Sequence, residues 1–284
     1  MARGGIDQGP GCLTLALDCR FKRHFILIPY SAGMSFFRNP LTRLKCAAYL
    51  LWIPYSLVLA APFEIKVHDE LIADYQHSAY EVETNLFQAP ASQGLKSNVF
   101  QTRLEYSYGI TEKSELGANI YLSNYNGMSY VNGGKISHMY IPTHDEEGLW
   151  HYGVKNEINY IKDVSGTETT FYELTPILAL QLQDWRFTIN PSVDVTLNKN
   201  SSATFSPSAK VAYELTHAVD VGMEYYGDNL PNKSLYNISQ QPHTAYLVMD
   251  AKHGKSSFNF GIGKGVTANS DNWVIKLIAS LSFN

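Results

Sequence analysis

Residues 185–197, WRFTINPSVDVTL, alternate without a break between apolar and polar side chains. A period of two predicts a β-strand with one apolar face and one polar face. Strands in soluble proteins usually span about five or six residues, whereas a strand that crosses a bilayer at a tilt needs about 9–11. The length of this stretch therefore favours a membrane-spanning strand. Pro191 and Pro207 fall inside such stretches, where a missing N–H predicts a broken ladder bond or a bulge.

The same alternation recurs along most of the chain and predicts twelve strands. In chain order they are 78–87, 100–108, 115–123, 135–142, 150–161, 170–182, 185–197, 204–215, 219–226, 243–252, 256–265 and 272–283. The fourth and tenth have the least distinct faces.

The predicted connections alternate between short and long. Short turns fall at 110–113, 143–148, 183–184, 216–218 and 253–254, and longer polar segments at 88–97, 124–134, 162–169, 198–203, 227–242 and 266–271. Short turns at one end and longer loops at the other are typical of a transmembrane antiparallel up-and-down β-barrel. We therefore predict an all-β fold of about 12 strands in the bacterial outer membrane.

Charged residues within the strands fall opposite the apolar faces. Burying so many charges in a dry core would cost several kcal/mol each, so we expect them to line a wet lumen. The predicted lumen-lining residues are Arg103, Glu105, Lys155, Glu157, Glu173, Arg186, Asp194, Lys210, Glu214, Glu224 and Lys276. A soluble sandwich or lipocalin-like barrel would show the same alternation, but the strand lengths and an export signal argue against it.

Aromatic residues gather near the predicted strand ends, as in an interfacial girdle. The predicted membrane-interface aromatics are Tyr106, Tyr108, Trp150, Trp185, Tyr213, Trp273 and Phe283. The last strand, from Trp273 to Phe283, resembles the C-terminal assembly signal of outer-membrane proteins, displaced by one residue because Asn284 follows the aromatic. We expect it to engage the outer-membrane assembly machinery, and we expect lipids of that membrane to surround the barrel.

Residues 34–60 carry a basic stretch, an apolar run and a small-residue cleavage site, which predicts a signal peptide. Because this signal begins at Met34, we interpret residues 1–33 as a disordered extension that results from a misplaced gene start. Residues 61–77 are then a periplasmic N-terminal segment, and residues 78–284 form the barrel. All three cysteines precede the predicted cleavage site, so the mature chain contains no thiol.

Removal of residues 1–60 leaves 15 basic and 24 acidic residues, a net charge of −9. This acidity argues against nucleic acid as a partner and favours cations or neutral solutes as cargo.

No catalytic or metal-binding motif is present at the expected spacing, so we predict no enzyme activity, no metal and no cofactor. The stretch 260–265, FGIGKG, lacks the full spacing of a phosphate loop and is better explained by close packing within a strand. His138 with Ser137, and Ser206 with Ser208, are the residues that a lipid-modifying enzyme would use. Histidines near the short turns include no metal-motif pair; they are His68, His77, His144, His151, His217 and His253.

Several stretches together resemble the outer-membrane proteins of the phenol-degradation meta-pathway family. They are FQTRLEYSYGITEKSELGAN at 100–119, ELTPIL at 173–178, WRFTINP at 185–191, VGMEYYG at 221–227 and FNFGIGKG at 258–265. The resemblance covers 78–283 and implies a barrel of about twelve strands that passes small, aromatic or hydrophobic compounds. It brings no catalytic or ligand-binding residue with it.

We therefore predict a porin-like pore or facilitator for small-molecule solutes. The alternatives are an outer-membrane lipid-modifying enzyme and an exported soluble β-barrel binding protein.

Overall fold

The computed structural model describes residues 12–14, 27–29, 63–88, 98–143, 148–163, 166–198, 202–227, 230–231 and 241–283. The chain divides into two units, 1–59 and 60–284. In the first unit, β1 (Cys12–Thr14) and β2 (Leu27–Pro29) pair antiparallel within the predicted disordered extension. The signal peptide predicted at 34–60 lies outside the described residues.

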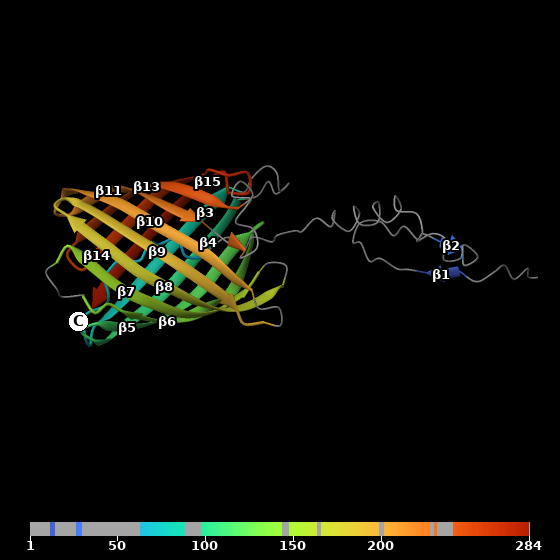
Figure 1. The fold of residues 1–284 in the computed structure, drawn as a ribbon, viewed down its shortest axis with the longest axis horizontal. Coiled ribbons are helices and arrows are strands. Elements are labelled where there is room, and N and C mark those ends of the chain that lie inside the picture. The colour runs from blue at the N-terminus through green and yellow to red at the C-terminus, as the bar shows by residue number, and fades with distance from the viewer. Residues whose placement is uncertain are drawn as a thin grey trace, which may run out of the picture. The chain divides into compact units, whose positions relative to one another are not determined.

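The second unit is a closed antiparallel barrel of twelve strands, which confirms the predicted fold class (Figure 1). Its strands are β3 (Ser78–Gln88), β4 (Asn98–Thr111), β5 (Ser114–Tyr125), β6 (Met128–Tyr140), β7 (Trp150–Lys162), β8 (Glu168–Leu182), β9 (Trp185–Thr196), β10 (Ala203–Thr216), β11 (Val219–Gly227), β13 (His243–His253), β14 (Ser256–Gly265) and β15 (Trp273–Phe283). Each pairs with the next, and β15 pairs with β3 to close the ring. A two-residue strand, β12 (Leu230–Pro231), adds to β10. No helix in the described part of the chain is long and apolar enough to cross a membrane.

The apolar side chains face outward and the polar ones face inward. In β15, Trp273, Ile275 and Leu277 are exposed, whereas Val274 and Lys276 between them are buried. A soluble barrel would show the reverse arrangement, because water would then be the outer solvent.

The predicted long loop at 124–134 is wrong. β5 and β6 continue into a tight hairpin at Asn126 and Gly127, whose φ values of 52° and 76° suit a two-residue type I′ turn. The register shifts between Tyr121 and Leu122, and Gly133 has a φ of 125°. This bulge interrupts the alternation of apolar and polar residues, so the sequence pattern did not predict the first half of β6 as a strand.

Candidate functional site: a lumen occupied by residues 63–77

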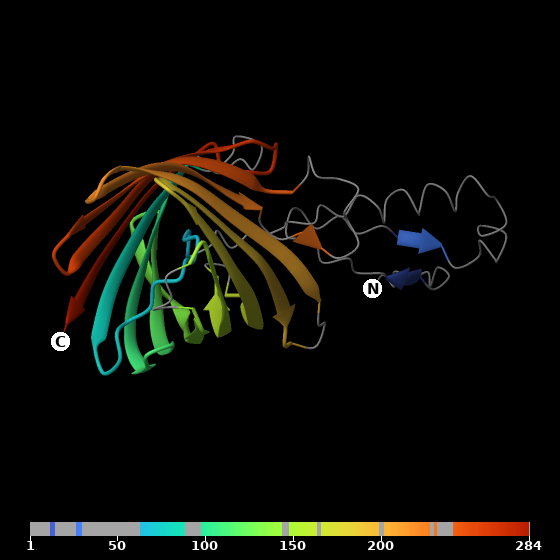
Figure 2. The same cartoon turned by 60° about the vertical axis from the view of Figure 1, so that its left-hand side comes forward.

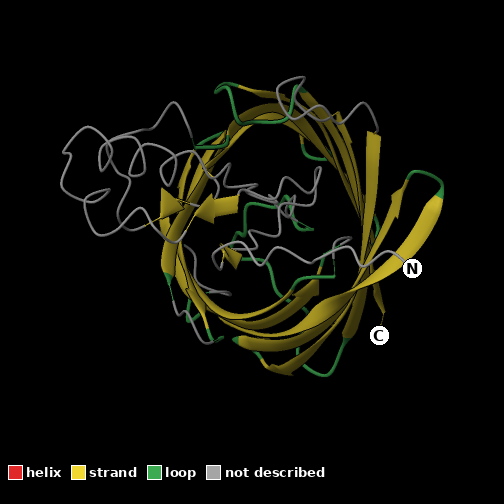
Figure 3. Cartoon of the chain, turned by 90° about the vertical axis from the view of Figure 1, so that its right-hand side faces the viewer, coloured by secondary structure: helices red, strands yellow, loops and turns green. Residues whose placement is uncertain are grey.

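We name residues 63–77, predicted as a periplasmic N-terminal segment, the lumenal segment. Its residues 63–70 pack against inward-facing side chains of the barrel, and its exposed end reaches the bridge between Tyr75 and Gly109 at the end of β4. Figure 3 shows loop chain, drawn in green, within the ring of strands, and Figure 2 shows the cyan stretch before β3 inside the curve of the sheet. Phe63, Ile65 and Val67 are buried, and the Phe63 ring stacks on Tyr121 with centroids 4.8 Å apart. The segment therefore reduces the free cross-section of the lumen.

Inward side chains of the strands bind the backbone of the lumenal segment. The N–H of Ile65 donates to Glu83 Oε1 at 2.6 Å, and the ammonium of Lys276 donates to the Ile65 carbonyl at 3.0 Å. Nearer the C-terminal end of the segment, the N–H of Ala73 donates to Glu115 at 2.7 Å. Buried peptide groups require partners, and here the barrel wall supplies them in place of a ladder. Alternation in the sequence could not reveal these contacts, because they join a non-strand segment to distant side chains.

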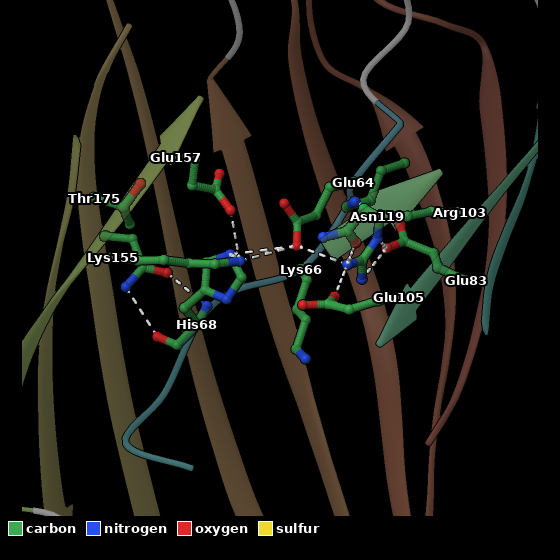
Figure 4. Close-up of polar contacts among 12 residues, drawn as sticks. Glu64, Lys66, His68, Glu83, Arg103, Glu105, Asn119, Lys155, Glu157 and Thr175 are labelled. Carbon is green, nitrogen blue, oxygen red and sulfur yellow. Dashed lines mark hydrogen bonds and ion pairs between the residues drawn. The ribbon is translucent and has the colours of Figure 1, made fainter. Parts of the chain in front are cut away.

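The guanidinium of Arg103 is fully buried and lies among four carboxylates (Figure 4). Its Nη atoms lie 3.2 Å from Glu64 Oε1 and 2.9 Å from Glu83 Oε2, and it also forms ion pairs with Glu81 and Glu105. Five N–H donors in a planar fork allow one arginine to satisfy several carboxylates at once. Glu64 belongs to the lumenal segment, so this cluster joins the segment to β3 and β4.

A second cluster joins the same glutamate to β6 and β7, which follow β4 and β5 in the ring. Glu64 forms ion pairs with Lys135 on β6 and, at 3.4 Å, with Lys155 on β7. Glu157 lies 2.6 Å from the Lys135 ammonium and 2.8 Å from that of Lys155. His68 Nε2 lies 3.2 Å from the Lys155 ammonium (Figure 4). The segment therefore bridges β4, β6 and β7 through one carboxylate.

A third cluster lies on β10, β11, β13 and β15. Glu224 forms ion pairs with Lys276 and, at 3.4 Å, with Lys210, which lies 2.7 Å from Asp250. The Tyr226 hydroxyl donates to Glu224 at 2.6 Å. Lys276 also holds the Ile65 carbonyl, so this cluster too is tied to the lumenal segment.

The pKa values of two segment residues are shifted by this environment. Burial raises the pKa of Glu64, but the charges of Arg103, Lys135 and Lys155 outweigh it and hold the pKa well below its usual range. Burial, assisted by the charge of Lys155, lowers the pKa of His68 well below its usual range. Glu64 is therefore ionised and His68 neutral when the segment is docked near neutral pH.

The structure brings together seven of the predicted lumen-lining residues in the three clusters. They are Arg103, Glu105, Lys155, Glu157, Lys210, Glu224 and Lys276. Arg186 instead pairs with Glu70 of the lumenal segment at 3.3 Å. Glu214 lies at the β10–β11 turn beside the exposed His217, at the rim of the barrel.

Glu173 and Asp194 lie directly opposite each other on β8 and β9, and the structure gives neither an ion pair within its described ranges. Glu173 accepts a hydrogen bond from Thr175, and Asp194 accepts one from Ser206 at 2.8 Å. Hydroxyl groups therefore donate hydrogen bonds to these two carboxylates, whereas Lys and Arg side chains form ion pairs with the carboxylates of the three clusters.

Glu64, His68, Glu81, Glu83, Lys135 and Asn190 were missed as site residues. For Lys135 the cause was the unclear alternation of its strand. For Glu64 and His68 the only signal was the mixture of apolar and charged positions in 63–70, which does not indicate a location by itself.

An apolar cluster inside the lumen surrounds Ile65. It consists of Ile65, Phe87, Tyr246, Val248 and Val274, all buried. The glycines of β14 make room for it: a Cβ on Gly263 would lie 2.3 Å from the Tyr246 ring, and one on Gly261 would lie 2.8 Å from Lys276. The stretch FGIGKG therefore serves close packing of side chains from neighbouring strands.

Six of the seven predicted interface aromatics are exposed on the outer face, from Tyr108 at 37 % to Trp150 at 63 % of their maximal area. Tyr213 is half-buried because its ring packs on Trp185, with centroids 5.0 Å apart. Their contact with a membrane interface stays a prediction.

The side chains considered for lipid chemistry do not form a catalytic group. Ser137 and His138 are consecutive in β6 and point to opposite faces of the wall. Ser206 donates to Asp194, and Ser208 lies 3.5 Å from Asn190, with no histidine in either contact. Within the described ranges, no three His, Cys, Asp or Glu residues are placed to hold a metal ion.

Comparison with known proteins identifies the architecture as that of bacterial outer-membrane β-barrels. No family model matches the chain, and no curated protein matches it. Among solved structures, the COG4313 outer-membrane channel from Pseudomonas putida F1 is similar with a TM-score of 0.56 and 11 % identity, over 78 % of this chain and 100 % of that one. The KdgM porin is similar with a TM-score of 0.50 and 8 % identity, over 72 % of this chain and 99 % of that one. At these identities the likeness concerns the fold.

Proposed function

We propose that this chain is an outer-membrane channel for small solutes whose lumen is regulated by the lumenal segment. The observation that carries the proposal is the inversion of the barrel, with charged clusters inside and a continuous apolar surface outside. Hydrocarbon is the solvent that such an outer face matches, and closure of the strands leaves no unpaired edge within it. The similarity of the fold to channel and porin structures supports the same class of function.

The lumenal segment is suited to act as a removable constriction. If the signal peptide is cleaved after Ala60, the mature chain begins at Ala61, two residues before Phe63. A free chain end can leave the lumen without breaking any strand pairing, since the segment is tied to the wall by side-chain contacts and, at its lower end, by a bridge between Tyr75 and Gly109.

The class of solute is inferred from the net charge of the mature chain and from its resemblance to a known family. The mature net charge of −9 favours cations or neutral molecules over anions. The resemblance to the phenol-degradation meta-pathway family points to small aromatic or hydrophobic compounds. Outer-membrane lipids would surround the barrel, and the strand from Trp273 to Phe283 would engage the assembly machinery during insertion.

Conductance in planar bilayers tests the proposal. The mature chain beginning at residue 61 is expected to conduct weakly and to prefer cations, and deletion of residues 61–74 is expected to raise the conductance. As a control, an equal number of residues can be added before Ala61, which should leave the docked segment in place. Absence of conductance from both the full and the truncated chain would contradict a channel.

A further inference from the structure

Side chains of the barrel wall hold Ile65 of the lumenal segment by its N–H, its carbonyl and its side chain. The N–H donates to Glu83 Oε1 at 2.6 Å, and the carbonyl accepts a hydrogen bond from the Lys276 ammonium at 3.0 Å. The side chain is buried in the apolar cluster described above. The wall therefore presents an acceptor, a donor and an apolar pocket that together fit one amino-acid residue.

The two polar partners of Ile65 carry full charges, although a peptide group needs only neutral ones. Glu83 on β3 and Lys276 on β15 are diagonal neighbours, since the ladder pairs Glu83 with Ile278 and Lys276 with Asn85. Hydrogen bonds in which both groups are ionised are shorter and roughly twice as strong as neutral ones. A free ammonium at Glu83 and a free carboxylate at Lys276 therefore match this pair better than the peptide does.

Departure of the lumenal segment leaves excess negative charge beside Glu83. Lys66 leaves with the segment and gives up its ion pair with Glu81, which spans 2.8 Å. Arg103 then faces the three carboxylates of Glu81, Glu83 and Glu105, an excess of two negative charges. Buried charges require opposite charges nearby, so the vacated position favours a cationic group such as an ammonium.

Lys276 has a donor to offer once the Ile65 carbonyl has gone. An ammonium carries three N–H donors. One is directed to Glu224, and the Tyr226 hydroxyl oxygen lies 3.4 Å from the ammonium. Glu224 is shared with the ammonium of Lys210, at 3.4 Å, so it does not serve Lys276 alone. A carboxylate can therefore take the place of the Ile65 carbonyl.

The pocket around the Ile65 side chain suits a branched aliphatic or aromatic group of similar size. Phe87, Tyr246, Val248 and Val274 line it, and all four are buried. Phe87 is the next-to-last residue of β3 and Val274 is the second residue of β15, at the end where the connections 89–97 and 266–272 lie. Longer connections face the cell exterior in outer-membrane barrels, so an incoming solute meets this pocket early in its path.

The arrangement is specific for one hand of an amino acid. Glu83, Lys276 and the apolar pocket hold the N–H, the carbonyl and the side chain of an L residue. A D-amino acid with its ammonium and carboxylate in the same places would direct its side chain away from the pocket. A hydrocarbon would fill the pocket but leave both buried charges without a partner, which is costly.

We propose that the wall around Ile65 is a binding site for a free apolar L-α-amino acid, which takes the place of Ile65. The ammonium of the ligand lies on Glu83, its carboxylate on Lys276 and its side chain in the apolar pocket. The lumenal segment occupies the site when no ligand is bound, so the segment and the amino acid compete. This inference rests on the proposed channel function and narrows the solute to small zwitterions of zero net charge.

Uptake of the two enantiomers of isoleucine tests the site. The mature chain beginning at residue 61 is reconstituted in liposomes, and uptake of radiolabelled L-isoleucine and D-isoleucine is measured together with K⁺ conductance in planar bilayers. L-isoleucine uptake is expected to saturate and, at low concentration, to be roughly tenfold faster than D-isoleucine uptake, the factor expected when only one enantiomer buries its side chain.

The outcomes separate the site from the channel. Equal rates for the two enantiomers, or no uptake of either, would overturn the amino-acid site if K⁺ conductance is present. Absence of both uptake and conductance would overturn the channel itself.

A substitution at the ammonium end tests the role of Glu83. Glu83→Gln is expected to lose the preference for L-isoleucine, because an amide cannot compensate an ammonium charge. Asp194→Asn is the matched control, since Asp194 is also an inward carboxylate but accepts hydrogen bonds from Thr204 and Ser206 rather than from the segment. Equal preference for L-isoleucine in the two variants would contradict the proposal.

Competition with the lumenal segment is tested at a residue outside the pocket. Asn190 binds both the N–H and the carbonyl of His68, so Asn190→Ala weakens docking of the segment without touching Glu83 or Lys276. The concentration of L-isoleucine that gives half-maximal uptake is expected to fall, because a larger fraction of the protein then has a vacant site. An unchanged half-saturation concentration would overturn the competition, including in the case that Glu83→Gln does not assemble.

Discussion

Asn190 and His68 are joined by two hydrogen bonds that reproduce a short piece of β-ladder. The His68 N–H donates to Asn190 Oδ1 at 2.7 Å, and Asn190 Nδ2 donates to the His68 carbonyl at 2.9 Å. An amide side chain carries an acceptor oxygen and donor N–H groups side by side, so it can satisfy both backbone groups of a residue at once. The asparagine before Pro191 therefore connects the barrel wall to the lumenal segment.

Loss of this contact should release the lumenal segment. Asn190→Ala leaves two buried peptide groups without partners, which costs about 1–3 kcal/mol each. We expect higher single-channel conductance or a larger open fraction in planar bilayers, with little change in barrel assembly. Asn259→Ala is the control, since Asn259 also faces inward but donates to Asp250 rather than to the segment. Equal conductance of the two variants would contradict a role for Asn190 in holding the segment.

Removal of the Arg103 side chain should destabilise the barrel as well as the docked segment. Arg103→Ala leaves Glu64, Glu81, Glu83 and Glu105 close together without their shared cation, and breaking a buried ion pair in this way costs about 3–5 kcal/mol. The expected result is a lower unfolding temperature of the detergent-solubilised protein. Adding Glu83→Gln should restore part of the loss, because it removes one uncompensated charge. A variant as stable as the unmodified protein would show that water, and not Arg103, compensates these carboxylates.

Acid should open the channel. Burial in the docked state, together with the charge of Lys155, lowers the pKa of His68 below the ordinary histidine value of about 6.5, so docking is fully favoured above that pH and weakens as the pH falls below it. Glu64 acts in the same direction at lower pH, because its docked pKa lies well below 4.5 and protonation removes its ion pairs with Arg103, Lys135 and Lys155. Conductance measured from pH 8 to pH 4 is expected to rise as the pH decreases.

The contribution of His68 to this pH dependence can be isolated with a substitution. His68→Asn keeps a polar side chain and the backbone contacts with Asn190 but removes the group that titrates below 6.5. We expect the rise in conductance to begin at lower pH in this variant. His253→Asn, at the exposed end of β13, should keep the unmodified profile. A profile that is unchanged by His68→Asn would assign the pH dependence to other groups.

The glycine at 263 should tolerate no side chain. Gly263→Val would place its Cβ 2.3 Å from the Tyr246 ring, which is itself packed against Val274 and Ile65. We expect poor assembly, measured as loss of the compact band in unheated gel electrophoresis. Gly148→Ala, whose Cβ would meet no atom closer than 3.8 Å, should assemble normally. Normal assembly of Gly263→Val would mean that Tyr246 can move aside at little cost.

The strand pattern was predictable because a barrel wall separates two solvents. Every second residue meets either hydrocarbon or the lumen, so the alternation in stretches such as 185–197 indicates the wall directly. The pattern failed where the backbone departs from simple alternation. Asn126–Gly127 is a strong signal for a two-residue hairpin, but the bulge opposite Tyr121 and Leu122 interrupts the alternation in β6, so residues 128–134 were not predicted as part of a strand.

The sequence by itself determined the barrel, its strand count and the division between apolar and charged faces, since these follow from local periodicity. Only the tertiary structure decided that residues 63–70 occupy the lumen and that Pro176 and Pro191 lie opposite each other where the β8–β9 ladder is interrupted. Both depend on which distant residues become neighbours once the ring has closed. Contacts such as that between His68 and Asn190 leave no periodic trace in the chain, because a single side chain makes them across the lumen.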